Sequence, residues 1–499
     1  MDMMYDTFDD MEGDGYDVMY PDDMADMEAW MAEHGEDYFD TQAEQLATRA
    51  PLWEYLPSCG SETLMQTLVY VYPLLGLCFL FNMCCRLQQT SRNGENEEEG
   101  VTIPREVAHM TSVLTGLVAC HIFFQSLFLY LVLLLLLAYT LLLLVHRVSP
   151  GYCGLVVSSV TVMYIITCEL FLVETEKWHK IRGAQMVLSM KIISVAFDVD
   201  TGHLGVPRVW EFAGYCLHVG TVIFGPWVPY KQYNALFLKQ DEGRGIFSWL
   251  LKMFFSLVLS LFCLFWSTCC LHWLILEHFH KWFVAYRDAQ SYRFSHYFIS
   301  YLSEVTATMT GMTGTVSNGD SQWDFAVARP CHIEVPRSLV EVVTHWNLPM
   351  HYWLKTYVFK TARPLGNFTA ILLTYAASSV LHGLNFQLAA VLFSLGFYSY
   401  VEYVFRGKLA RIFSACIKAK KCKPECEHTY KASHPYVIST NLVFASLALA
   451  HLTYLGLMFD SSDQEETGYT MQHTLRKWSN LGFVSHWVAL GTFIFHLLI

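Results

Sequence analysis

The chain has 499 residues, of which 54% are hydrophobic and only 15% are charged, and its mean hydropathy is +0.30. Soluble domains usually carry about a quarter charged residues, so this composition excludes an ordinary soluble enzyme, a mainly disordered chain and a small disulfide-rich secreted module. The formal net charge of −13 comes from the N-terminus, because Met1–Asp40 holds 15 acidic residues and no Lys or Arg. The remaining 30 acidic residues face 32 basic ones, so the rest of the chain lacks the basic face that a nucleic-acid partner needs.

The acidic N-terminal stretch has neither the basic segment nor the apolar core of a cleaved signal peptide. Its Asp, Glu, Met and Gly content is typical of a disordered segment. We therefore expect residues 1–60 to form an acidic, disordered tail and residues 61–499 to form one membrane domain. The first hydrophobic helix, near Met65, is expected to direct insertion into the membrane of the endoplasmic reticulum.

Long uncharged segments predict membrane-spanning helices. The clearest, Ile122–Val145, has 24 residues without Asp, Glu, Lys or Arg, and it spans roughly 36 Å, enough for a hydrocarbon core of about 30 Å. Comparable segments lie near 65–85, 154–173, 253–277, 369–381, 386–405, 436–459 and 479–498, and more polar helices are expected at 104–120, 183–197, 209–227, 284–310 and 338–360. Because backbone groups in lipid must be bonded within their own segment, we predict an all-α polytopic membrane protein with roughly nine to twelve membrane helices around an internal tunnel.

Residues Thr344–Lys360 combine several aromatic side chains with Pro349, a proline suited to the first turn of a helix. Asn347 lies just before this helix, where its side chain is well placed to cap the first turn. The alternative is that its amide orients a substrate carbonyl or stabilises an oxyanion. The spacing alone favours the cap.

The stretch 365–401 contains 37 consecutive residues without Asp, Glu, Lys or Arg, which is too long for one membrane span. The Gly-Leu-Asn tripeptide at 383–385 is the natural break, and His382 stands just before it. On the same helical face as His382, the spacing places Tyr375, Ser378 and Ser379. Because ionisable groups at membrane depth are costly, His382 is either a hydrogen-bonded structural residue or a base in a lined cavity.

The 15 cysteines do not indicate a set of disulfides. Most lie inside apolar segments, where a cysteine behaves as a small hydrophobic residue; examples are Cys78, Cys120, Cys168, Cys216, Cys263 and Cys269. A closer group, Cys416, Cys422, Cys426 and His428, would suit zinc, a disulfide or neither. Its basic surroundings indicate the cytosolic side of the membrane, where a disulfide is disfavoured, and its spacing matches no common zinc pattern. We therefore assign no metal site from the sequence.

A set of motifs follows in a fixed order along the chain. Trp346-Asn347 is followed by Trp353-Leu354, by Tyr357 and, 35 residues after the asparagine, by His382. Longer phrases are WHKIRGAQMVLSMKIISVAFDVD (178–200), WEFAGY (210–215), FGPW (224–227), FSHYFISYLSEVTAT (294–308), VPRSLVEVVTHWNLPMHYWLKTYVFK (335–360), LLTYAASSVLHGLNFQLAAVLFSL (372–395), FRGKLARIFSAC (405–416) and RKWSNLGFVSHWVALGTFIFHLLI (476–499). Together they resemble the membrane-bound O-acyltransferase superfamily, and within it the enzymes that acylate Wnt proteins. The resemblance covers roughly residues 60–499.

The resemblance implies a multi-pass enzyme of the endoplasmic reticulum membrane. It would transfer a palmitoleoyl group from palmitoleoyl-CoA to a serine hydroxyl of Wnt proteins, a step needed for their secretion and signalling. By the same likeness His382 is the general base and Asn347 its companion in the active site. Because a thioester is already activated, we expect acyl-CoA as co-substrate and neither a permanently bound cofactor nor a metal. The candidate substrate-binding residues are Trp346, Trp353, Tyr375, Ser378 and Ser379 for the acyl chain, and Arg337, Lys355 and Lys360 for the phosphates of CoA.

Three other functions are compatible with the sequence. An acyltransferase of the same superfamily with a different acceptor would share these motifs. A transporter would also carry a buried histidine and interrupted helices, but the two halves of the sequence show no inverted pair of interrupted segments. A non-catalytic membrane chaperone of secretory cargo would keep the fold and lose the transfer.

Overall fold

The computed structural model describes residues 51–93, 104–237, 245–276, 278–314, 316–317, 320–321, 323–423, 425–459 and 470–499. The acidic stretch Met1–Asp40 lies outside these described residues. Within them the chain is almost entirely helical, with one short antiparallel pair of strands. The predicted all-α class is confirmed.

The elements fall into three groups along the chain. The first comprises α2 (Leu52–Asn93), α3 (Arg105–Phe124), the 3₁₀ turn η3 (Gln125–Leu127), α4 (Phe128–Val148), α5 (Cys153–Thr167), the π-helical turn η4 (Cys168–Leu172), α6 (Thr175–Asp200), α7 (Val209–Cys216), α8 (Val219–Val222) and α9 (Tyr230–Ala235). The second comprises α10 (Ile246–Phe265), the π-helical turn η5 (Trp266–Cys270), α11 (Leu271–Leu274), α12 (Lys281–Met309), β1 (Val316–Ser317) and β2 (Asp320–Ser321).

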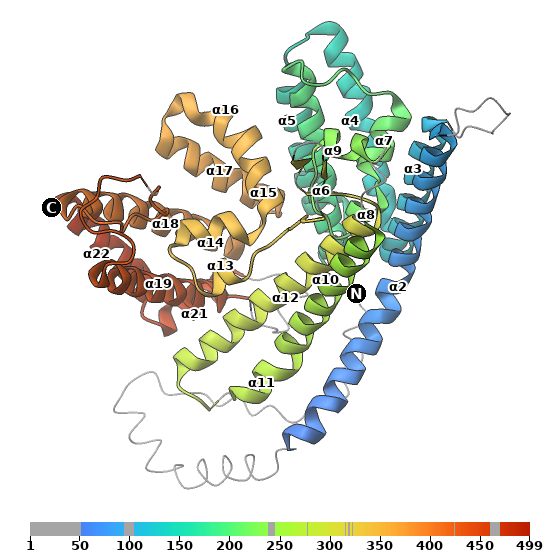
Figure 1. Ribbon diagram of the computed structural model, residues 1–499. Coiled ribbons are helices and arrows are strands. Elements are labelled where there is room, and N and C mark those ends of the chain that lie inside the picture. The colour runs from blue at the N-terminus through green and yellow to red at the C-terminus, as the bar shows by residue number, and fades with distance from the viewer. Residues whose placement is uncertain are drawn as a thin grey trace.

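The third group begins with α13 (Cys331–Glu334), α14 (Leu339–Trp346), α15 (Leu348–Trp353), the π-helical turn η6 (Leu354–Phe359), α16 (Lys360–Ala362), the 3₁₀ turn η7 (Arg363–Leu365) and α17 (Asn367–Leu381). It continues with α18 (Phe386–Ile412), α19 (Pro435–Gly456), α21 (Met471–Asn480) and α22 (Val484–Leu498). In Figure 1 the first group lies mainly on the right and the third on the left, and α10 and α12 run between them.

Six helices of the described residues are long and apolar enough to cross a membrane, and the bent pair α21–α22 would add a seventh span. The six are Leu52–Leu87, Arg105–Val148, Cys153–Leu172, Ile246–Leu274, Phe386–Ile412 and Pro435–Gly456. The expected nine to twelve membrane helices included shorter or more polar ones, such as α6, α12 and α17, which do not meet this criterion. The protein is therefore a multi-pass membrane protein with six or seven strongly apolar spans.

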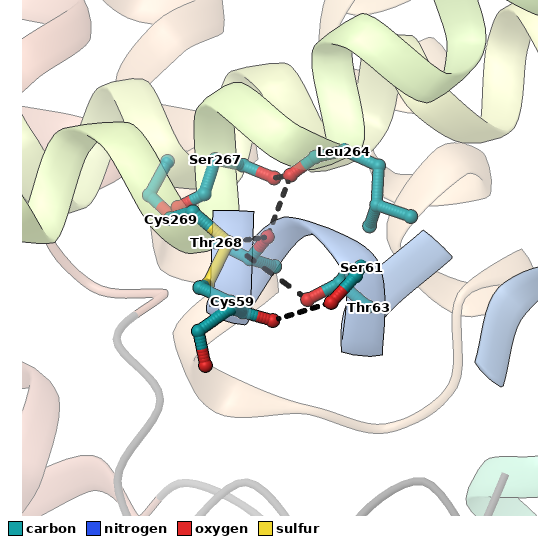
Figure 2. The surroundings of a disulfide bond; sticks show 9 residues. Cys59, Ser61, Thr63, Leu264, Ser267, Thr268 and Cys269 are labelled. Atoms are coloured by element: carbon teal, nitrogen blue, oxygen red, sulfur yellow. Dashed lines mark hydrogen bonds between the residues drawn. A yellow bond between two sulfur atoms is a disulfide. The ribbon is translucent and has the colours of Figure 1, made fainter. Parts of the chain in front are cut away.

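The first described helix, α2, begins earlier than we expected. It starts at Leu52, so the helical region extends upstream of residue 61, where we placed the start of the membrane domain. Cys59 in its second turn forms a disulfide with Cys269 of η5 (Figure 2). Cys269 is thus not the plain core residue that its apolar surroundings suggested. Thr63 contacts the same sulfur at 3.8 Å, so the first turns of α2 are fixed against the end of α10.

Two clusters of buried apolar side chains form the core. The larger is built mainly by α2–α9 and also includes Trp353, Tyr357 and Leu381. The smaller is built mainly by α12, α14, α18, α19 and α21. The segment from α14 to α17 contributes to both clusters and therefore joins the two parts of the protein.

Buried charged groups on α12 hold the segment that leads to α14. Arg293 donates two hydrogen bonds to the Glu334 carboxylate, at 2.8 and 3.0 Å. Glu304 accepts from the backbone N–H of Val327 at 2.8 Å and pairs with Lys252 of α10 at 2.7 Å. Because breaking a buried ion pair leaves an uncompensated charge, these contacts fix residues 327–334 relative to α12.

Candidate active site

A cavity of about 1440 Å³ lies between the two cores. Its walls come from α6, α12, α14, α15, η6, α17, α18 and α19. Much of the wall is apolar and includes Leu354, Phe359, Ile371, Leu388, Val391, Leu392, Leu395, Leu452 and Leu455. The volume exceeds the roughly 300–1,000 Å³ typical of small-molecule sites, so the cavity suits a ligand with a long chain and a large head group.

His382 lines the cavity at the point where α17 ends. Its backbone N–H donates to the carbonyls of Ser378 and Ser379, at 3.2 and 3.1 Å, so the last turn of α17 still holds this residue. Gly383 then takes a φ of +95°, which glycine tolerates and other residues rarely adopt. The chain enters α18 after Asn385. The predicted break at 383–385 is confirmed, and it leaves His382 at a helix end in the wall of the cavity.

The turn after His382 is held by Glu169, from η4. Both carboxylate oxygens of Glu169 accept from the backbone N–H of Leu384 at 2.8 Å. A Cβ atom at Gly383 would lie 2.8 Å from one of these oxygens, so this position requires glycine for space as well as for its φ. We did not assign Glu169 to the site from the sequence, although a single carboxylate inside the apolar segment 154–173 was a signal.

Asn347 caps α15, as the spacing indicated. Its Oδ1 accepts from the backbone N–H of Met350 at 2.9 Å. Asn347 also lines the same cavity as His382. Since the oxygen is used by the cap, the amide nitrogen is the atom that can donate to a substrate oxygen. The capping role and a role in the active site are therefore compatible.

His296 of α12 positions the residue before Asn347. Its Nε2 atom donates to the carbonyl oxygen of Trp346 at 2.9 Å. The two rings stack, with centroids 4.5 Å apart and planes at 12°. Both Trp346 and His296 line the cavity. We did not predict His296, although it belongs to the phrase at 294–308; nothing in the spacing linked it to Trp346.

The predicted acyl-chain residues divide into two sets. Tyr375 and Ser378 line the cavity with His382, whereas Ser379 and Trp353 do not. Ser379 is buried. Trp353 points into the larger core, where its indole Nε1 donates to the carbonyl of Met190 in α6 at 2.9 Å. A buried indole N–H normally finds such a partner, and this contact keeps the Trp353 ring out of the cavity.

Four basic side chains line the cavity and are also exposed to solvent: Lys355, Arg363, Lys420 and Lys421. They therefore lie where the cavity opens to the surface. Only Lys355 was among the residues that we predicted for phosphate binding. Arg337 lines the cavity too, but its Nε and Nη2 atoms donate to the carbonyls of Lys418 and Cys416, at 3.0 and 2.7 Å. Lys360 is exposed and does not line the cavity.

Two groups of side chains in the described part of the chain could hold a metal ion. One consists of Cys416, Cys422, Cys426 and His428, in the segment between α18 and α19. The other consists of His332, Glu341 and His345. Its members are engaged with one another and with the backbone: His332 Nδ1 donates to the Glu341 carboxylate at 2.7 Å, and His345 Nδ1 donates to the Glu341 carbonyl at 2.8 Å. These hydrogen bonds link the start of α14 to its end and to α13.

The arrangement suits general-base catalysis on a long-chain substrate. A neutral imidazole such as that of His382 accepts the proton of a hydroxyl. An amide N–H such as that of Asn347 donates to a carbonyl oxygen on which negative charge develops. The apolar wall suits a hydrocarbon chain, and the cations at the opening suit phosphate groups.

Comparison with known proteins agrees with this chemistry. The chain matches the model of the membrane-bound O-acyltransferase family over residues 117–415. It is 42% identical to the mouse protein-serine O-palmitoleoyltransferase porcupine and 41% identical to the human one, in each case over 89% of this chain and 97% of the relative. The porcupine of Anopheles gambiae is 33% identical over 67% of this chain and 72% of its own length. The chain belongs to the membrane-bound O-acyltransferase family.

Proposed function

We propose that this protein transfers a palmitoleoyl group from palmitoleoyl-CoA to a serine hydroxyl of Wnt proteins in the endoplasmic reticulum membrane, and that Wnt secretion and signalling need this step. The observation that carries the proposal is the presence of His382 and Asn347 in one large cavity with cations at its opening. The substrate assignment is supported by the relatives of 41–42% identity, which are named for transfer of this group to protein serine.

The donor substrate would extend along the length of the cavity. The phosphates of CoA would bind the exposed cations Lys355, Arg363, Lys420 and Lys421. The acyl chain would lie along the leucines of α18 and α19, with Tyr375 and Ser378 beside it. The thioester carbonyl, which joins these two parts of the ligand, would then lie near His382 and Asn347, which line the same cavity.

The reaction needs only these groups and the activated thioester. A serine hydroxyl is a weak nucleophile until a base accepts its proton. His382 takes this proton as the serine oxygen attacks the thioester carbonyl, and the Asn347 amide N–H donates to the carbonyl oxygen as negative charge develops. The carbon–sulfur bond then breaks, and protonated His382 returns the proton to the CoA thiolate. The products are an ester of serine and free CoA.

The test is transfer by the purified protein from palmitoleoyl-CoA to a Wnt-derived peptide, followed by mass spectrometry. His382→Ala should lower the rate about 10²- to 10⁴-fold, the usual contribution of a general base. His146→Ala is the matched control, because His146 is an exposed histidine at the end of α4 outside the cavity. A peptide with alanine in place of the acceptor serine should remain unmodified.

Three outcomes would contradict the proposal. Full activity of a folded His382→Ala variant would exclude His382 as the base. Transfer to a lysophospholipid but not to the peptide would identify a different acceptor. Retention of the peptide and of acyl-CoA without any ester product would support a chaperone or a transporter.

A further inference from the structure

Three cysteines and one histidine converge in the segment between α18 and α19. The Sγ atoms of Cys416, Cys422 and Cys426 and a ring nitrogen of His428 all lie within 4.8 Å of one another. We call these four residues the Cys3His cluster. Their spacing along the chain matches no common zinc pattern, so we assigned no metal site from the sequence. The fold nevertheless brings all four side chains together.

The distances within the Cys3His cluster agree with tetrahedral coordination of zinc. Bonds of about 2.3 Å to sulfur and about 2.0–2.1 Å to nitrogen place two sulfurs about 3.8 Å apart, and sulfur and nitrogen about 3.6 Å apart. The Sγ atoms of Cys416 and Cys426 are 3.4 Å apart, and His428 Nδ1 is 3.6 Å from the Sγ atoms of both Cys416 and Cys422. A disulfide would need two sulfurs about 2.05 Å apart and would use only two of the four ligands.

We propose that the Cys3His cluster binds one Zn²⁺ ion. Thiolate and imidazole ligands suit zinc, and four protein ligands with no open position are typical of a structural zinc site. Three thiolates and one Zn²⁺ leave one net negative charge. The ammonium group of Lys431 lies close enough to balance this charge. Lys431 Nζ lies 3.8 Å from Cys426 Sγ and also donates to the carbonyl oxygen of Cys426. Such neighbouring groups tune and stabilise the ligands of a metal site.

Backbone contacts bring the first ligand to the other three. The N–H of Cys416 donates to the carbonyl of Tyr430 at 2.9 Å, and the N–H of Tyr430 donates to the carbonyl of Ser414 at 3.0 Å. Cys422 and Cys426 pack against a small apolar cluster that surrounds Cys416 and consists of Ala410, Ala415, Ile417 and Val437. The site is thus partly screened from water on one side and exposed on the other, as expected for a zinc-stabilised surface segment.

A zinc ion in the Cys3His cluster would stabilise the segment that brings Lys420 and Lys421 to the cavity opening. Lys420 and Lys421 lie between the first and the second ligand, and both line the cavity. The same stretch is held from α14, because Ser338 Oγ donates to the carbonyl of Ala419 at 3.0 Å. The consequence for CoA binding rests on the proposed function, whereas the binding of zinc does not.

The experiment is elemental analysis of the full-length protein purified in detergent. We expect one zinc per chain in the wild type and in Cys331→Ser, the matched control, because Cys331 is an exposed free cysteine of α13 outside the cluster. Cys422→Ser and His428→Ala should lose zinc several-fold. His428→Cys keeps four ligands and should retain it.

A second measurement uses the wild-type protein alone and therefore does not depend on the folding of variants. Alkylation followed by mass spectrometry should modify the two partly exposed cluster cysteines, Cys422 and Cys426, only after a zinc chelator is added, and Cys331 without it. A zinc-free wild type, or cysteines released by a reductant and not by a chelator, would overturn the proposal. Zinc without acyl transfer would contradict the proposed function alone, and acyl transfer without zinc would contradict this inference alone.

Discussion

The position of His382 depends mainly on the backbone around it. The end of α17 holds its N–H on one side, and Glu169 holds the N–H of Leu384 on the other. Gly383 between them has no room for a side chain. A catalytic group held in this way stays in place as substrates arrive, and a displacement of about 1 Å can cost about 10²-fold in rate. If His382 is the base, as proposed, Glu169 acts as a positioning residue for it, although the two are far apart in the sequence.

Glu169→Ala should lower kcat roughly 10- to 100-fold, because the turn after His382 loses its acceptor. The KM for palmitoleoyl-CoA should change little, since the cations at the cavity opening are untouched. Glu169→Gln keeps an acceptor oxygen for Leu384 and should recover much of the rate. Steady-state kinetics measures both quantities. The control is Glu174→Ala, which removes a carboxylate whose side chain is 73% exposed; an equal loss of kcat in this control would exclude a specific role for Glu169.

At the scale of the helices, the pattern of hydrophobic residues predicted most of the helices and also the break between α17 and α18. The uncharged run 365–401 had to divide because one span needs about 20 residues, and the structure divides it into α17 and α18 on either side of His382. The prediction of which α17 side chains line the cavity was less accurate. Ser378 and Ser379 lie four and three residues before His382, so both are near its face. Spacing alone cannot decide which of the two lines the cavity; the packing of neighbouring helices selects Ser378.

Contacts between distant segments were beyond the reach of a single sequence. Cys59 and Cys269 are 210 residues apart. Cys269 lies in an apolar stretch where a free cysteine is equally at home, and Cys59 lies in the stretch that we assigned to the N-terminal tail. Trp353 was predicted to line the cavity because of its place in a motif, but a carbonyl of α6 holds its indole in the core. The four ligands of the Cys3His cluster are brought together by a backbone bridge between Ala415 and Tyr430. No local sequence pattern predicts this bridge.

The segment between α18 and α19 contributes charge to the cavity as well as a metal site. Lys420→Ala combined with Lys421→Ala should raise the KM for palmitoleoyl-CoA roughly 2- to 30-fold, since two exposed ion pairs contribute about 0.2–1 kcal/mol each. The effect should shrink as the salt concentration rises, because salt screens exposed charges. Measurements of KM at low and high ionic strength check both statements.

The matched control for these lysines is Lys418→Ala combined with Lys423→Ala. It removes the same charge from the same segment at two exposed side chains that do not line the cavity. Both double variants should retain zinc, because all four ligands remain. An equal rise of KM in the control would mean that net charge, and not the position of Lys420 and Lys421, governs donor binding.

At the scale of the whole molecule, the disulfide and the Cys3His cluster lie toward opposite ends of the membrane domain. The disulfide joins the start of α2 to the turn after α10, and α12 begins at Lys281, close to that turn in sequence. α19 ends at Gly456, which lies against Ala289 near the start of α12. Since α19 has 22 residues, it is about 33 Å long. Its first residue, and the cluster just before it, therefore lie near the other face.

The chemistry of the disulfide and of the Cys3His cluster indicates which side of the membrane each one faces. Stable disulfides require an oxidising compartment such as the lumen of the endoplasmic reticulum. Basic segments such as 418–431 favour the cytosolic side, where a zinc–thiolate site is also kept reduced. On the proposed function, the cations of the cavity opening would then face the cytosol, from which acyl-CoA would come, and a secreted acceptor would approach His382 from the lumen. The proposed transfer thus needs a cavity that is reached from both sides of the membrane.

Labelling of lysines in sealed microsomes tests this orientation, because their outer surface is cytosolic. A membrane-impermeant amine reagent should modify Lys423 in intact vesicles, and Lys281 only after detergent opens them; both side chains are exposed. Peptide mass spectrometry distinguishes the two sites, and the detergent-treated sample controls for intrinsic reactivity. Labelling of Lys281 with protection of Lys423 in intact vesicles would place Lys420 and Lys421 in the lumen, away from cytosolic acyl-CoA. The donor would then have to enter the cavity from the opposite end, and the assignment of these cations to the CoA phosphates would fail even if transfer itself were observed.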